Sequence, residues 1–336
     1  MSKIRVGVVG CGAIGREHAR RIANLIPETE LVGVADFFQE AAEKTAAQFG
    51  VKAYASAEEL IHSDDIDAFF ITSSDPSHAG YVLEGLKAKK FIFCEKPLAQ
   101  TSSDAEAIIK AELELGKKYV QVGFMRRYDR GYSEMKRIIE SGEIGDPLMI
   151  HSAHRNVSQA PGFLSNSAIT QVAIHELDIS RWLLDDEYEE AQVLEVRQSK
   201  STKGDWKNPL IVTMKTKSGQ RIDVEVQCSE AFAYDIQCQV VCEDGLVNLP
   251  DPMQVTVRKD AKIKKGLMTD WAQRFIEAYD IELAAWAKSI AENGEPNGPN
   301  SWDGYVACCT ADALIKSRET GVPEKVLTID KPELYK

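Results

Sequence analysis

The chain has 336 residues, of which 44% are hydrophobic and 27% charged, a globular composition without the bias of disordered proteins. This length can form two packed domains or one large one. The formal net charge is -12, and so acidic a protein repels nucleic acid and anionic membrane surfaces, so neither is expected as a partner.

The sequence gives no sign of export or membrane insertion. It opens with MSKIRVGVVG, which leads into an apolar strand pattern and does not resemble a signal peptide. No apolar run approaches the roughly 20 residues of a membrane span. The seven cysteines include no CxxC pair, which favours free thiols and a cytoplasmic location. Cys238 and Cys242 lie in an alternating strand pattern without a nearby histidine, which favours buried strand cysteines over a metal site.

Apolar runs alternate with helical patterns over residues 1–122. The runs have the length of buried parallel strands and are bounded by turn signals. Strands that alternate with helices imply right-handed βαβ units in a mostly parallel sheet, and so an α/β domain. Strands are predicted at 4–10, 30–36, 53–56, 67–72, 90–97 and 118–123, with helices at 13–26 and 39–50.

The turn after the first predicted strand reads GCGAIG and opens a helix. Gly10 permits the tight turn, Gly12 lets a pyrophosphate approach the backbone, and Gly15 allows the helix to pack closely on the strand. The N–H groups at the helix start, around Ala13 and Ile14, suit phosphate oxygens. In this setting the fingerprint predicts a Rossmann domain that binds a dinucleotide.

Asp36 ends the second predicted strand, 21 residues after Gly15. An acidic residue at that place accepts hydrogen bonds from the adenosine ribose hydroxyls. The same carboxylate would repel a 2′-phosphate, and no arginine follows it, so NAD is favoured over NADP. FAD uses a similar fingerprint, but flavoproteins of that type are usually longer.

Polar residues also follow the fourth and fifth predicted strands. Ser73 and His78 come after the fourth strand and are expected near the cofactor, His78 toward its nicotinamide end. Glu95 and Lys96 end the fifth strand, at the edge where open α/β sheets bind ligands. Lys96 could stabilise a developing alkoxide. On position alone, a surface lysine before a strand-ending proline is an equal reading.

The pattern changes near residue 123, where strand-like segments begin to follow one another without helices. Such an order favours an antiparallel sheet. Ser218-Gly219 and Asp244-Gly245 are typical hairpin turns. We therefore expect a second, α+β domain over 123–336 with a large, mainly antiparallel sheet. Its strands are predicted at 148–156, 190–199, 210–216, 220–229, 234–242 and 253–258, with helices at 271–292 and 302–319.

The segment ITQVAIHELDISRWLL, residues 169–184, places His175 in a largely apolar helix. Taken alone, such a histidine is more often a satisfied core residue than a base. His18, His62 and His151 have no supporting motif, and they are interpreted as surface or packing residues.

Several of these segments together resemble the glucose–fructose oxidoreductase / inositol dehydrogenase family. The dinucleotide fingerprint and EKP at 95–97 mark the family as a whole. GFMRRYD at 123–129 and SAHRN at 152–156 are similar to its NAD-dependent inositol branch. Further similar stretches, at 173–188, 234–245, 274–282 and 302–307, follow in the same order, so the resemblance runs essentially end to end.

The resemblance implies roles for individual residues. Lys96 matches the family's catalytic lysine, and His175 matches the histidine thought to act as general base. Positions associated with substrate hydroxyls are matched by Arg126, His154, Asn156, Asp178 and Tyr234. The inositol enzymes form tetramers, so a homotetramer is expected here, and the implied substrate is a small polyol or sugar.

One position departs from the family. Four residues before His175, where the family has an aspartate that can orient the histidine, this chain has Gln171. An amide can hydrogen-bond the ring or a substrate hydroxyl, but it brings no negative charge. We therefore expect a weaker base or a different hydroxyl geometry, with Asp178 taking over part of the role.

The leading expectation is oxidation of myo-inositol to its 2-keto product by NAD. Gln171 keeps open another inositol isomer or a pyranose sugar as the substrate. An NAD-binding sensor without catalysis ranks last, because Lys96 and His175 are both present.

Overall fold

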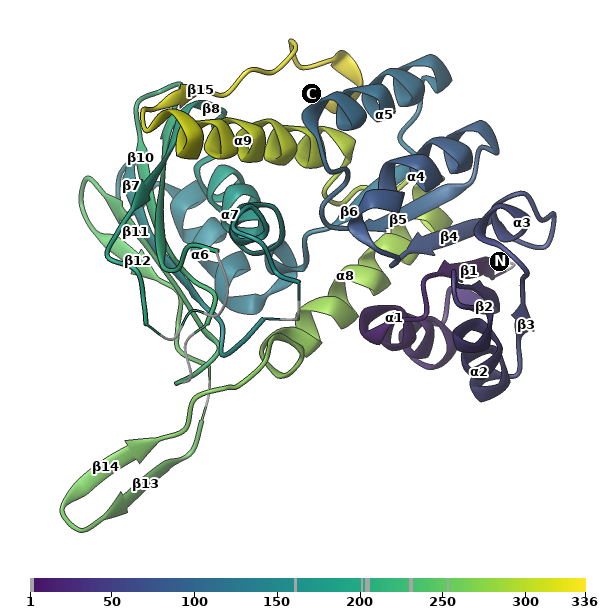
Figure 1. Cartoon of the computed structure of the whole chain (residues 1–336), viewed down its shortest axis with the longest axis horizontal. Coiled ribbons are helices and arrows are strands. Elements are labelled where there is room, and N and C mark those ends of the chain that lie inside the picture. The colour runs from purple at the N-terminus through teal and green to yellow at the C-terminus, as the bar shows by residue number, and fades with distance from the viewer. Residues whose placement is uncertain (1–2, 160–161, 201, 203–205, 230–231, 253) are drawn as a thin grey trace. The chain divides into compact units, whose positions relative to one another are not determined.

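The structure is a computed structural model that describes residues 3–159, 162–200, 202, 206–229, 232–252 and 254–336. The chain forms two compact units (Figure 1). Unit 1 comprises Met1–Phe124, Tyr279–Cys309 and Thr328–Lys336. Unit 2 comprises Met125–Ala278 and Thr310–Leu327.

Unit 1 contains a six-stranded sheet whose strand order is β3-β2-β1-β4-β5-β6 and whose neighbours all pair in parallel. The alternation of strands and helices predicted from the sequence is confirmed. The strands are β1 (Ile4–Val9), β2 (Thr29–Ala35), β3 (Lys52–Ala53), β4 (Ala68–Ile71), β5 (Phe91–Glu95) and β6 (Val120–Gly123). The helices between them are α1 (Ala13–Asn24), α2 (Gln39–Phe49), α3 (Ala57–Ile61), α4 (His78–Lys87) and α5 (Ser102–Leu115).

One face of this sheet is covered by α1, α2 and the later part of α8 (Trp271–Asn293). Apolar side chains from all three helices meet those of β1, β2, β4 and β5 in one buried cluster. Phe70 and Phe93 stack with ring centroids 4.7 Å apart, and Trp286 meets Phe70 edge to face at 5.0 Å. Aromatic pairs of this kind stabilise a core beyond the area that they bury.

The later chain segments explain why the compact units differ from a simple division at residue 122. Residues 123–336 were expected to form one domain, whereas Tyr279–Cys309 and Thr328–Lys336 pack with unit 1. Leu283, Trp286 and Ile290 of α8 are buried in the unit 1 core, so burial of apolar surface places that part of the helix there.

Unit 2 is built on a seven-stranded sheet of order β12-β11-β7-β10-β9-β8-β15. The predicted antiparallel character holds for every neighbouring pair except β7 and β10, which pair in parallel. The long crossover between β7 and β10 allows this parallel pairing. The strands are β7 (Pro147–Arg155), β8 (Tyr188–Glu195), β9 (Leu210–Thr216), β10 (Arg221–Gln227), β11 (Asp235–Cys242), β12 (Leu246–Asn248) and β15 (Glu324–Lys325).

Both predicted hairpin turns of unit 2 are confirmed. Ser218-Gly219 joins β9 to β10, and Asp244-Gly245 joins β11 to β12. Cys238 and Cys242 are buried strand residues of β11, as the sequence favoured.

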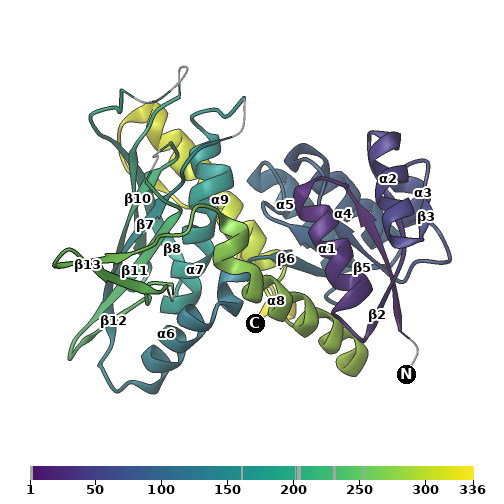
Figure 2. The same cartoon turned by 90° about the horizontal axis from the view of Figure 1, so that it is seen from below.

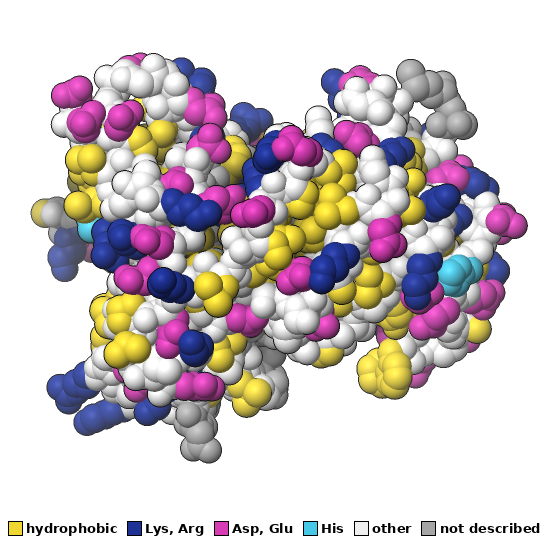
Figure 3. Space-filling model, turned by 90° about the horizontal axis from the view of Figure 1, so that it is seen from above, with side chains coloured by type: hydrophobic (Ala, Val, Ile, Leu, Met, Phe, Trp, Pro, Cys, Tyr) yellow, Lys and Arg dark blue, Asp and Glu magenta, His cyan; other side chains and the backbone are white. Residues whose placement is uncertain are grey.

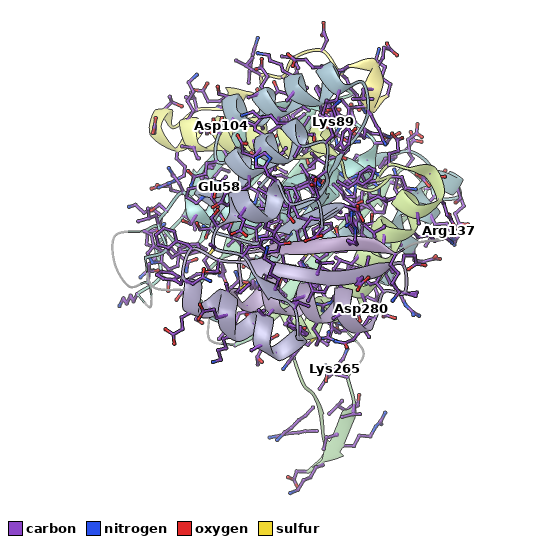
Figure 4. The ribbon with its side chains drawn as sticks, turned by 90° about the vertical axis from the view of Figure 1, so that its right-hand side faces the viewer. Glu58, Lys89, Asp104, Arg137, Lys265 and Asp280 are labelled. Atoms are coloured by element: carbon purple, nitrogen blue, oxygen red, sulfur yellow. The ribbon has the colours of Figure 1, made fainter. Side chains whose placement is uncertain are left out.

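The strand predicted at 253–258 is not part of the large sheet. Residue 253 lies outside the described residues, and Thr256–Lys259 forms β13, which pairs with β14 (Lys262–Lys265) in a separate hairpin. All eight residues of the two strands are exposed, including Val257 and Ile263, so neither strand is packed against the large sheet. Figure 4 marks Lys265, where β14 ends.

Helices cover one face of the unit 2 sheet. They include α6 (Arg130–Ser141) and α7 (Ile174–Leu184), which lie side by side in Figure 2. A π-helical turn, Ala168–Ala173, leads directly into α7. The two closing helices of the sequence analysis are confirmed as α8 and α9 (Ser301–Thr320). Among the described helices, none combines the length and apolar character of a membrane span.

The excess of acidic residues is not gathered into one patch on the face that Figure 3 shows. Asp and Glu side chains are interspersed there with Lys and Arg. Many ion pairs among the described residues are exposed, such as that of Arg137 with Glu134. Such exposed pairs contribute little to stability.

The aromatic cluster of unit 1 provides a stability test. Phe93 is fully buried and Phe37 is 93% exposed, so the chain offers a matched control. Phe93→Ala is expected to lower the free energy of unfolding by about 3–5 kcal/mol, because it opens a cavity beside Phe70 and Trp286. Phe37→Ala is expected to change it by less than about 0.5 kcal/mol. Chemical denaturation without NAD measures both, and equal losses would contradict the assigned core.

Candidate active site

A hollow of about 710 Å³ lies in unit 1 at the carboxyl ends of β1, β2 and β4. In a parallel α/β sheet this edge is where ligands bind. Four residues predicted from the sequence to contact the cofactor line it, namely Gly10, Gly12, Asp36 and Ser73. Sequence reasoning missed three aromatic lining residues, Phe37, Phe38 and Tyr81.

The glycine loop has the geometry that a pyrophosphate requires. Gly10 has a φ of +101°, and a Cβ at Gly15 would lie 1.9 Å from the carbonyl oxygen of Gly10. Both positions therefore need glycine. A Cβ at Gly12 would meet nothing within 4 Å, so the backbone there is open to a ligand. Gly12 is also the N-cap of α1, and no side chain caps the helix start at Ala13, which leaves its N–H groups suited to phosphate.

Asp36 is held by the backbone around it. Its Oδ2 accepts a hydrogen bond from the Cys11 N–H at 2.6 Å, and its Oδ1 accepts one from the Phe38 N–H at 2.8 Å. The carboxylate is therefore fixed beside the glycine loop and borders the hollow. This arrangement fits the ribose-binding role predicted for Asp36.

Residues at the ends of β4 and β5 are linked through His78. Its Nδ1 lies 2.7 Å from the carbonyl oxygen of Pro97 and its Nε2 lies 3.2 Å from that of Ser73. The Lys96–Pro97 bond is cis, and Lys96 is partly buried. His78 is itself buried, so its geometry supports a role in holding these two loops together.

Glu95 lies in the interior of unit 1. It is 6% exposed, and its Oε1 lies 2.8 Å from Nε2 of His18, which is fully buried. His18 is thus a packing residue, one of the two alternatives given by the sequence. Glu95 is absent from the residues that line the hollow, and its contact with the cofactor stays a prediction.

In unit 2, His175 stands at the start of α7 and is 7% exposed. The π-helical turn before it contains Gln171, which is exposed. In an α-helix these two residues would share a face, because i and i+4 are neighbours there. A π turn forms i→i+5 hydrogen bonds, so the spacing of side chains differs there. This turn was not predicted, and π turns are frequent at functional sites.

A buried polar cluster lies beside His175. Arg126 Nη1 donates to Glu176 Oε1, and Nδ1 of His154 lies 2.9 Å from Glu176 Oε2. Arg126 Nη2 lies 3.1 Å from the same Nδ1. The ring centroids of His154 and His175 are 6.1 Å apart, and His154 meets the ring of Tyr234 edge to face at 5.9 Å. The structure therefore brings together four of the predicted residues.

Glu176 is the member of this cluster that sequence reasoning missed. It is 1% exposed, as is Arg126. Burial raises the pKa of the Glu176 carboxyl, but Arg126 and His154 together bring it below its usual range. Glu176 is thus a buried carboxylate that is paired with a buried guanidinium. The available signal was an acidic residue in a largely apolar helix.

Tyr234 contributes a hydroxyl group to the same cluster. Burial raises the pKa of Tyr234 to about 12, against the opposing effect of the nearby Arg126. At neutral pH this residue is therefore an uncharged phenol that can donate a hydrogen bond.

The remaining predicted substrate residues lie nearby in sequence but have other partners. Asp178 is 2% exposed and accepts hydrogen bonds from Arg127, one of them from Nε at 3.0 Å. This ion pair argues against Asp178 replacing the missing aspartate. Asn156 follows β7 and is partly buried, and its backbone N–H donates to Gln227 at 2.8 Å.

Two family models match the chain. One describes an oxidoreductase family with an NAD-binding Rossmann fold and matches residues 4–124. The other describes the C-terminal alpha/beta domain of the same family and matches residues 136–326.

The chain belongs to the GFO/IDH/MocA oxidoreductase family.

Relatives in this family align over nearly the whole chain. The chain is 43% identical to an inositol 2-dehydrogenase/D-chiro-inositol 3-dehydrogenase of Halalkalibacterium halodurans, with 99% of this chain and 96% of the relative covered. It is 45% identical to an inositol 2-dehydrogenase of Acidiphilium cryptum, with 99% of each covered. Among solved structures, it is similar to myo-inositol dehydrogenase from Lactobacillus casei in complex with NAD(H) and myo-inositol. That match has a TM-score of 0.96 and 37% identity, and covers 99% of this chain and 100% of the other.

These matches confirm the predicted family, fold class, enzyme class and cofactor. The chain is an NAD-dependent oxidoreductase of the GFO/IDH/MocA family. When bound, NAD supplies the acceptor for a hydride. The glycine loop, the start of α1 and Asp36 are the parts of this chain that fit it.

The open space at Gly12 gives a test of this cofactor site. Gly12→Ala is expected to leave the melting temperature of the NAD-free protein unchanged, because its Cβ meets no protein atom within 4 Å. It is expected to weaken NAD binding by about tenfold or more, or ~1.4 kcal/mol, because the methyl group occupies the approach of the pyrophosphate. Calorimetry measures the affinity.

Gly80→Ala is the matched control, since a Cβ there also meets nothing within 4 Å and Gly80 lies in α4. It is expected to leave the NAD affinity unchanged. Undiminished NAD binding by the Gly12→Ala protein would contradict the placement of the pyrophosphate at this loop.

Proposed function

We propose that the chain oxidises a secondary hydroxyl of an inositol with NAD, and that myo-inositol, converted to its 2-keto product, is the leading substrate. The observation that carries this proposal is the similarity, at 43–45% identity over 99% of the chain, to proteins named inositol 2-dehydrogenase. Agreement between the family's substrate positions and the buried polar cluster of unit 2 supports it.

The reaction removes a hydride from carbon and a proton from oxygen, so a base must lie near the reacting hydroxyl. In the proposal His175 takes this proton, since a neutral imidazole titrates in the range that such a base needs. Lys96 brings a positive charge that favours the developing alkoxide. The proton thus moves from the substrate oxygen to a ring nitrogen of His175 while the hydride leaves from carbon.

The other hydroxyls of the substrate need hydrogen-bonding partners in the protein. His154 lies beside His175 and offers a ring nitrogen, and Tyr234 lies beside His154 and offers a phenol. These groups hold the substrate by directed hydrogen bonds, which suits a polyol because each of its ring carbons can carry a hydroxyl. Correct orientation of the reacting carbon is itself a large part of catalysis.

Gln171 favours a second candidate that keeps the chemistry and changes the substrate. An exposed amide in a π turn replaces the family's aspartate, so hydroxyl recognition at that place differs. The second candidate is another inositol isomer or a pyranose sugar. The double name of the Halalkalibacterium halodurans relative, which includes D-chiro-inositol, illustrates such breadth in the family.

Assembly and location complete the proposal as a cytoplasmic homotetramer. The tetramer follows from resemblance to the inositol enzymes. All seven cysteines lie within the described residues, where each is buried and outside any disulfide. Cysteines without disulfides are typical of proteins in reducing compartments.

The proposed catalytic pair is tested with a panel of myo-, scyllo- and D-chiro-inositol and glucose, by following NADH formation. The wild-type protein is expected to oxidise myo-inositol or another member of the panel. His175→Ala is expected to lower kcat by about 10²–10⁴-fold, the usual contribution of a general base. Lys96→Ala is expected to lower kcat as well, with both variants still folded by circular dichroism. Wild-type activity in either variant would remove that residue from the mechanism.

Gln171→Asp tests the altered position. The carboxylate is expected to raise kcat for myo-inositol by up to about tenfold, because one unit of pKa shift at the base corresponds to ~1.4 kcal/mol. Gln171→Asn is the matched control and is expected to gain nothing, since it shortens the side chain without adding charge. If Gln171→Asp lowers activity on myo-inositol while another substrate is used well, the second candidate is favoured.

A further inference from the structure

The buried cluster of unit 2 contains a carboxylate that the proposed reaction does not use. Glu176 is neighbour in sequence to His175, yet its two oxygens face Arg126 and His154. Side chains this buried are rarely charged unless they are paired with another group. The question is therefore what Glu176 does for the two residues that it contacts.

We infer that Glu176 is a positioning residue, which fixes the protonation pattern of the His154 ring so that Nε2 can accept a hydrogen bond from one substrate hydroxyl. This inference rests on the proposed function, because it assumes that His154 faces the polyol. It assigns to the ring a direction of hydrogen bonding that neither the sequence nor the fold gives.

His154 Nδ1 and Glu176 Oε2 are in contact at 2.9 Å. An ionised carboxylate only accepts hydrogen bonds, so Nδ1 must carry the hydrogen in this contact. A neutral imidazole has a single N–H, and Nε2 is then left with a lone pair. The contact therefore selects one tautomer, as second partners of histidine commonly do.

Arg126 also lies near Nδ1 of His154, but it does not determine the tautomer of the ring. Its Nη2 lies 3.1 Å from Nδ1, and a guanidinium can only donate. Nδ1 cannot accept from Arg126 while it donates to Glu176. A charge-assisted bond to a carboxylate is the stronger of the two, so the tautomer follows Glu176.

Arg126 instead keeps Glu176 ionised. Both residues are 1% exposed, and a lone carboxylate at such depth would take up a proton. The Arg126 guanidinium also lies 5.5 Å from the centre of the Phe275 ring, and this contact helps to hold the guanidinium in place. In this account Arg126 supports the carboxylate from behind and does not bind a hydroxyl, which changes the role implied by the family.

The rings of His154 and His175 lie 6.1 Å apart, centroid to centroid, so both can contact one small substrate. His175 accepts the proton of the reacting hydroxyl, and His154 accepts a hydrogen bond from a second hydroxyl of the same molecule. The site then requires a substrate with at least two hydroxyls on one small ring, and a monohydric alcohol lacks the second contact.

The first experiment reads the tautomer directly and needs no substrate. Nitrogen-15 NMR of the folded, histidine-labelled protein distinguishes Nδ1–H from Nε2–H, with the His154 signals assigned from the spectrum of His154→Gln. The expected result is a neutral ring that carries its hydrogen on Nδ1. A ring with its hydrogen on Nε2, or with hydrogens on both nitrogens, would overturn the inference, whatever the activity of the protein.

The second experiment compares Glu176→Gln, His154→Ala and the double variant on the best polyol of the panel. Glu176→Gln is expected to raise the KM for the polyol about tenfold, with the Kd for NAD unchanged, because a weaker partner no longer fixes the ring. In the His154→Ala background the same substitution is expected to change KM less than twofold. Glu176→Asp, which keeps the charge, is expected to recover part of the loss.

Glu187→Gln is the matched control, since Glu187 also pairs with an arginine of unit 2, Arg181, but lies outside the cluster. It is expected to leave the KM unchanged. An equal effect of Glu176→Gln with and without His154 would overturn the inference, because Glu176 would then act on its own. Wild-type inactivity on every polyol, with hydrogen on Nδ1 of His154, would refute the proposed function and leave the tautomer assignment standing.

Discussion

The buried polar cluster of unit 2 depends on one ion pair, between Arg126 and Glu176. Neither charge would be stable alone at this depth, because the cost of removing an ion from water exceeds what most single contacts return. Both members of the pair also contact Nδ1 of His154. Loss of either partner would leave an uncompensated buried charge, so the cluster requires both residues.

The cofactor side obeys a different constraint, which is set by the backbone. Gly10, Gly12 and Gly15 are needed for a positive φ, an open approach and close packing respectively. Asp36 is then anchored by N–H groups of the same region. Local backbone geometry therefore forms the cofactor site, whereas the buried polar cluster of unit 2 depends on contacts between residues far apart in the sequence.

This difference explains what could be predicted. The parallel sheet, the glycine loop, Asp36 and both hairpins follow from local patterns, and the structure contains them. The ion pair of Glu176 with Arg126 joins residues 50 positions apart, so no local pattern announces it. The parallel pairing of β7 with β10 and the packing of Tyr279–Cys309 on unit 1 likewise depend on contacts between residues far apart in the sequence. The π turn around Gln171 was not predicted either.

The central claim is that this chain moves a hydride from a hydroxyl-bearing ring carbon of an inositol to NAD. The most direct measurement uses myo-inositol that carries deuterium on the carbon to be oxidised, with mass spectrometry of both products. The account predicts one deuterium in the reduced cofactor and none at the new carbonyl carbon. Reduced cofactor without deuterium, or an intact labelled inositol after long incubation with NAD, would contradict it.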